Sequence, residues 1–189
     1  MLRFAQGIGI ALLLVMAVLG LRRDDDIETA PEFVVDMAAQ RSDYYLESFI
    51  IRTFDAAGLL AREVTGDTLT HYPASNTARI EPVAVVIHRS PAPDWHISAV
   101  HGDMRSDSRQ MRLLGDVLIK RDTIDSEQAL RVETRSLNLD ADLQTFASAD
   151  PTQMTSAHWH SSGVGLSGDA KSGELRLLDQ VKIIYEHPR

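Results

Sequence analysis

The feature that most constrains the fold is a twelve-residue stretch that the sequence contains in two copies. Residues 110–121 read QMRLLGDVLIKR, and residues 174–185 read ELRLLDQVKIIY. A short polar lead-in precedes each copy, GDMRS in the first case and GDAKS in the second. Such self-similarity is typical of a repeated structural unit, here a strand, a polar turn and a second strand. A fainter copy spans residues 66–85 and slips near Pro82, where we expect a bulge or an edge position.

The apolar residues from Asp43 onward recur with a period near two, which is typical of strands. Residues 48–55 and 59–65 flank Gly58 and predict a hairpin with a glycine turn. Beyond residue 21 no helical stripe of useful length is found, and only short segments are expected between Asp140 and the second copy. About ten short strands separated by turn signals predict an all-β sandwich, jelly roll or barrel-like solenoid.

Residues 4–21 form an apolar run in which only Gln6 is polar. As a helix the run would be about 27 Å long, close to the roughly 30 Å core of a bilayer. We therefore predict a transmembrane anchor over residues 1–23, a linker over residues 24–42, and a domain over residues 43–189 displayed outside the cytoplasm. A cleaved signal peptide is the alternative interpretation.

The charge balance argues against several classes of partner and site. The net charge of −8 disfavours nucleic acid, whose phosphates require clustered Lys and Arg. The sequence contains no cysteine, which excludes disulfides, thiolate catalysis and cysteine-ligated metals. Neither a cofactor nor a metal is expected.

Three motifs suggest chemistry but fit other interpretations better. Residues 163–168 match the G-x-G-x-x-G spacing of dinucleotide-binding loops, yet the residues that follow predict a turn where that loop requires a helix. His158 and His160 could share a metal if extended, but no complete ligand set accompanies them. Asp140 and Asp142 would be paired carboxylates, but the sequence shows no cleft around them. An enzyme is not predicted.

A series of short motifs follows in order along the whole chain. They are the apolar N-terminus followed by Asp43-Tyr44-Tyr45, Phe54-Asp55-x-x-Gly58-x-Leu60, His71-Tyr72-Pro73, Glu81-Pro82, Trp95-x-Ile97-x-Ala99, Leu113-x-Gly115-Asp116-Val117, Thr134-x-x-Leu137, Ser162-Gly163 and Val181-x-x-x-Tyr185. In order and spacing these motifs resemble the LptC family of lipopolysaccharide-export proteins. The resemblance implies a β-jellyroll of two packed antiparallel sheets with OstA-like repeats and one N-terminal transmembrane helix. It also implies a single-pass inner-membrane protein of Gram-negative bacteria with its C-terminal domain in the periplasm. Leu114 departs from the family, in which an aromatic residue often precedes the glycine.

The resemblance further implies lipopolysaccharide transport from the inner to the outer membrane. The protein would receive lipopolysaccharide from the membrane subunits of an ABC transporter and pass it to the periplasmic bridge protein LptA, with acyl chains in the apolar interior. The predicted lipid-binding residues are Phe49, Ile51, Trp95, Ile97, Leu113, Gly115, Val117, Ile119, Val132, Leu137, Leu139, Leu177, Val181 and Ile183. The last strand, residues 174–185, is the expected edge for LptA. The alternative is a scaffold that joins transporter and bridge without binding lipid.

Overall fold

The computed structural model describes residues 41–105, 107, 110–122, 129–140 and 144–185, all within a compact unit that spans residues 37–189. The predicted transmembrane anchor and all but the end of the predicted linker lie outside the described residues. Within the described ranges, no helix is long and apolar enough to cross a membrane.

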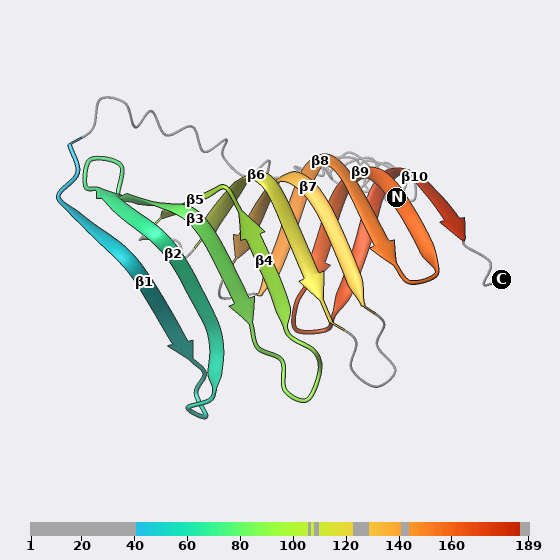
Figure 1. Cartoon of the computed structure of the whole chain (residues 1–189), viewed down its shortest axis with the longest axis horizontal. Helices are drawn as coiled ribbons and strands as arrows, with labels where there is room; N and C mark the ends of the chain where they lie inside the picture. The colour runs from blue at the N-terminus through green and yellow to red at the C-terminus, as the bar shows by residue number, and fades with distance from the viewer. Residues whose placement is uncertain (1–40, 106, 108–109, 123–128, 141–143, 186–189) are drawn as a thin grey trace, which may run out of the picture. The chain divides into compact units, whose positions relative to one another are not determined.

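The described chain is all-β, as the sequence predicts, and its strands form one antiparallel sheet (Figure 1). The strands are β1 Tyr44–Phe54, β2 Leu60–Tyr72, β3 Thr77–Ile87, β4 Trp95–Ala99, β5 His101–Arg105, β6 Gln110–Arg121, β7 Leu130–Asp140, β8 Thr145–Ser156, β9 Trp159–Asp169 and β10 Glu174–Tyr185. Their order in the sheet is β1-β2-β3-β4-β6-β7-β8-β9-β10, and β5 pairs with β3 and β6. Within the part of the chain that the structure describes, the sheet therefore ends in two edge strands, β1 and β10.

A line of irregular positions crosses the sheet and folds it into two layers. Ser48, Gly115, Gly165 and Gln180 have positive φ angles on four different strands, and Val100 separates β4 from β5. These five residues define what we call the crease. The pairing register shifts on β6, β7, β8 and β10 near the same line. Such bulges bend a strand and increase its twist.

Each long strand contributes one half to each layer across the crease. The layer with β5 contains the first half of β3 and the first half of β6, and the layer with β4 contains their second halves. In Figure 1 the strands turn over along the upper side of the view. The architecture is thus one antiparallel sheet folded into two packed layers, which is consistent with the expected β-jellyroll.

Side chains from both layers fill the space between them. Trp95 on β4 meets Phe146 on β8 edge-on, with ring centroids 5.8 Å apart. Leu113, Leu137 and Leu166 have no exposed surface. This packing of side chains between layers is the hydrophobic core of the unit.

The two copies of the repeated stretch are strands β6 and β10, with the predicted bounds. The aligned residues Asp116 and Gln180 have φ angles of 47° and 49°, so both copies bend at the same point. Their surroundings differ, because β6 lies between two neighbours and β10 has one. The repeat therefore encodes a strand that bends, while its place in the sheet sets its burial.

The predicted first hairpin is confirmed. Gly58 has a φ of 79°, and its backbone N–H donates to the carbonyl oxygen of Asp55 at 3.0 Å. The Asp55 carboxylate accepts from the backbone N–H groups of Ala57 and Leu59, both at 2.9 Å. The expectation of short segments after Asp140 is wrong, because β8 and β9 are long strands that form a hairpin.

Candidate functional site: the apolar interior and its ends

Eight of the predicted lining residues meet in the centre of the folded sheet. These residues, which we call the central lining, are Trp95, Ile97, Leu113, Val117, Ile119, Val132, Leu137 and Leu139, and each is at most 2% exposed. They come from both layers and belong to one hydrophobic cluster. The centre is a filled core in this structure, so acyl chains can occupy it only if the two layers move apart.

Four positions on β6 show which side of this doubly apolar strand faces inward. Leu113 and Ile119 are 0% exposed, whereas Leu114 and Leu118 are only partly buried. The register of β6 is therefore the one that the alternation predicts. A slip by one residue would have exchanged the two faces.

The remaining apolar positions lie on the two edge strands. We call Phe49, Ile51, Leu177, Val181 and Ile183 the edge lining. Phe49 and Leu177 are partly buried against the core, and Ile51, Val181 and Ile183 are 37%, 49% and 50% exposed. The apolar surface that is buried in the centre thus continues to both edges, where it meets solvent.

Gly115 has a structural role that the sequence analysis does not assign to it. It lies on the crease with a φ of 77°, a conformation that glycine adopts without steric cost. A Cβ atom added there would lie 2.9 Å from the Cβ of Val100, a residue that is 55% exposed. The bend and this close approach account for the glycine without any space left for a ligand.

Both edges also carry exposed apolar side chains that the sequence analysis missed as a group. On β1 they are Tyr44, Tyr45, Leu46, Ile50 and Phe54, and on β10 they are Leu178, Ile184 and Tyr185. No strand among the described residues pairs with the outer side of β1 or β10, so each edge presents backbone N–H and C=O groups there. The alternating pattern could not reveal these residues, because it does not say which strands end the sheet.

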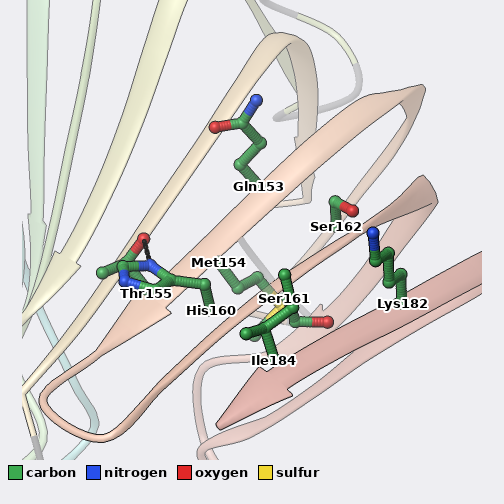
Figure 2. A pocket seen from close by; sticks show the side chains of 8 residues that line it. All are labelled: Gln153, Met154, Thr155, His160, Ser161, Ser162, Lys182 and Ile184. Carbon is green, nitrogen blue, oxygen red and sulfur yellow. Dashed lines mark hydrogen bonds between the residues drawn. The ribbon is translucent and has the colours of Figure 1, made fainter. Parts of the chain in front are cut away.

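A small polar pocket lies where β10 meets the β8–β9 hairpin (Figure 2). Its volume is about 110 Å³, below the roughly 300–1,000 Å³ of pockets that hold drug-sized ligands. Lys182 and His160 bring nitrogen atoms to it, and the His160 Nδ1 lies 3.2 Å from the Thr155 hydroxyl. Its size and polarity do not suit an acyl chain.

The three motifs that suggested chemistry lie as follows. Residues 163–168 belong to β9 and lead into a turn, as expected, so no helix N-terminus is formed. His158 occupies the β8–β9 turn and His160 lies on β9. No group of three potential metal ligands is found among the described residues. Asp142 lies outside them.

One half-buried ion pair connects β3 to β5 in the layer that contains β5. The Arg79 guanidinium donates to both carboxylate oxygens of Asp103, at 2.8 and 3.0 Å. The Asp103 side chain is 5% exposed, and its hydrogen bonds raise the pKa of Arg79. Bidentate pairing of this kind fixes the relative position of two strands.

Comparison with known families identifies the chain. The sequence model of the family described as "Lipopolysaccharide-assembly, LptC-related" matches residues 8–186. The chain belongs to the LptC family. As an LptC-family protein it is a component of the lipopolysaccharide transport system of the cell envelope. The LptC family is not a known enzyme family. Comparison with curated protein sequences gives no match.

Proposed function

We propose that this LptC-family protein receives lipopolysaccharide from the inner-membrane ABC transporter and passes it to the periplasmic bridge protein LptA. The acyl chains lie between the two layers during transfer. The observation that carries the proposal is the apolar surface that runs from the β1 edge through the central lining to the β10 edge.

The energetics suit a transfer module better than a storage site. Keeping apolar surface out of water is worth about 25 cal/mol per Å². Acyl chains that cover Ile51, Val181 and Ile183 gain this term, because the three side chains are exposed without lipid. In the centre the chains replace contacts between buried side chains, so the gain there is small. Binding that is weak in the middle and favourable at both ends allows lipid to move onward.

The two edges supply the connections to partners. Residues 1–23 anchor the protein in the inner membrane as a single span, and the strand domain lies in the periplasm. The unpaired side of β10 adds a strand of LptA, a mode of binding that uses backbone hydrogen bonds for affinity. The exposed Leu178, Ile184 and Tyr185 give this edge apolar contacts as well.

The filled centre supports one alternative function, a scaffold that joins transporter and bridge without taking up lipid. All eight residues of the central lining are at most 2% exposed, as in an ordinary core. In this alternative both edges bind proteins and the layers never separate.

Photo-crosslinking in cells separates the two functions. Ile183 and Ile184 are neighbours on β10 with 50% and 53% exposure, but Ile183 shares a cross-strand row with the buried Ser161 and Ile184 one with the exposed His160. A photoreactive residue at position 183 should capture lipopolysaccharide, while the same residue at 184 should capture protein only. No lipopolysaccharide adduct at 183, with normal amounts of protein, would favour the scaffold.

A further inference from the structure

Two arginines continue the inward-facing side of two strands in the layer that contains β4. Arg121 is the last residue of β6, two residues after the buried Ile119, and Arg89 lies two residues beyond the buried Ile87, where β3 ends. Alternation along β6 puts Arg121 on the side that Ile119 takes. The Arg89 side chain lies on the same side, because it contacts the turn that Arg121 also contacts. The apolar interior therefore ends in two cationic groups at this rim.

The turn between β9 and β10, which belongs to the other layer, lies over both arginines. Arg89 Nη2 donates to the carbonyl oxygen of Lys171 at 3.5 Å, and Arg121 Nη1 donates to that of Gly173 at 3.3 Å. Gly173 has a φ of 81°, and a Cβ atom there would lie 2.9 Å from Arg89 Nη2. Two guanidinium groups thus converge on one turn, and Figure 1 shows this turn beside the arrowhead of β6.

The contacts of Arg89 leave its guanidinium donors poorly used. The other acceptor of the Arg89 side chain is the carbonyl oxygen of Pro93, also at 3.5 Å, and both distances are at the long limit of a hydrogen bond. Arg89 Nε and Trp95 Nε1 are both buried without a hydrogen-bond partner. The Arg121 guanidinium carbon lies 5.0 Å from the centroid of the Trp95 ring. Within the described ranges no carboxylate forms an ion pair with the Arg89 guanidinium.

The chemistry of this rim matches a phosphate attached to an apolar body. Guanidinium groups bind phosphate through two parallel charge-assisted hydrogen bonds, a geometry that single carbonyl oxygens do not provide. The chain as a whole carries a net charge of −8, yet Arg89, Arg121 and the exposed Lys171 bring three cationic groups to this rim, beside the Asp169 carboxylate of the same turn. Acyl chains fit the interior that ends at these groups.

We propose that Arg89 and Arg121 form a binding site for the phosphate group of a lipid whose acyl chains lie between the layers. The inference rests on the proposed lipid function and adds the residues that select a phosphorylated headgroup. Phosphate oxygens take the place of the Lys171 and Gly173 carbonyl oxygens as partners of the two guanidinium groups. Release of the turn frees one layer from the other at this rim, which is where the acyl chains need space.

Binding of three probes to the full chain in detergent micelles tests the site. The probes are bisphosphorylated lipid A, the same lipid A after dephosphorylation, and inorganic phosphate as a competitor. Arg89→Gln and Arg121→Gln should each weaken binding of the phosphorylated lipid about 10-fold or more, the effect of losing a charge-assisted hydrogen bond. Their binding of the dephosphorylated lipid should change less than about 2-fold, a difference too small for a lost hydrogen bond. Arg135→Gln is the matched control, because Arg135 is 75% exposed and pairs with Asp150.

The outcomes distinguish this site from the function on which it rests. Equal loss for both lipids, unchanged binding in both variants, or equal affinity of the unchanged protein for both lipids would overturn the phosphate site and leave lipid binding in place. No binding of either lipid by the unchanged protein would overturn the lipid function itself. Displacement of the lipid by millimolar inorganic phosphate would show that the site takes free phosphate, which contradicts the lipid headgroup as its occupant.

A conservative variant covers the case in which a glutamine variant does not fold. Arg89→Lys keeps the charge but loses the bidentate geometry, so it should fold and keep part of the preference for the phosphorylated lipid. A partial or full loss of the preference in a folded Arg89→Lys protein would support the bidentate contact. An unchanged preference there would contradict it.

Discussion

A matched pair of leucines in the two copies of the repeated stretch tests whether the centre of the sheet is a packed core. Leu113 on β6 and Leu177 on β10 are aligned, but Leu113 is 0% exposed and Leu177 is only partly buried at the edge. Leu113→Ala should lower the free energy of unfolding by about 2–5 kcal/mol, since it removes buried methyl groups and leaves a cavity. Leu177→Ala should cost about 1 kcal/mol or less, because solvent or relaxed neighbours fill the space.

Urea unfolding of the full chain, followed by tryptophan fluorescence, measures both changes. In a domain of this size each kcal/mol corresponds to about 2–4 °C in melting temperature, which gives a second readout of the same difference. The two variants should differ by at least about 1 kcal/mol. Equal effects of the two substitutions would refute the reasoning, because they would mean that the layers are already apart around Leu113.

Three further predictions concern the fold. Gly66→Ala places a Cβ atom 2.5 Å from a side-chain carbon of Ile80, so it should destabilise the unit by about 1–3 kcal/mol in chemical denaturation, and a change below about 0.5 kcal/mol would contradict the close packing. Asp103→Asn removes the charge from a 5% exposed side chain that accepts two arginine hydrogen bonds, and it should lower the free energy of unfolding by about 1–3 kcal/mol. The pKa of Asp43 lies below its ordinary value of 3.8, chiefly through its hydrogen bond with His71, so its stabilising contribution is complete above pH 3.8 and is lost as the pH falls through the lowered pKa. An NMR titration that places the Asp43 pKa at or above 3.8 would contradict this pairing.

Local signals in the sequence predict the parts of the fold that depend on neighbouring residues. The hairpin around Gly58 follows from its turn glycine, and the bounds of β6 and β10 follow from the repeated pattern. The faces of β6 also follow from alternation, because Leu113 and Ile119 turn inward. All of these features are encoded over a few residues.

Features that depend on the whole sheet could not be predicted in the same way. Pro151 and the glycines of residues 163–168 interrupt the alternation, although they lie within β8 and β9. The sequence predicted one continuous lining, whereas position in the sheet divides it into a buried centre and exposed edges. That division depends on how many neighbours each strand has, which local pattern does not encode.

The sequence contains a local signal for the inward side of Arg89 and Arg121. Arg89 continues the alternate positions of Val85 and Ile87 two residues beyond the end of β3, and Arg121 follows Ile119 in the same way on β6. Alternation alone places both arginines on the inward side, where an isolated charge is unexpected. Their convergence on one turn depends on the folding of the sheet at the crease and could not be read from the sequence.

The central claim is that the two layers separate to hold acyl chains, and a distance measurement tests it most directly. The chain has no cysteine, so spin labels can be placed specifically at Asn138→Cys in one layer and Gln153→Cys in the other, both exposed positions. Pulsed electron paramagnetic resonance on the full chain, with and without lipopolysaccharide, should show a longer distance between the labels when the lipid is bound. An unchanged distance in a sample that has bound lipopolysaccharide would contradict the claim.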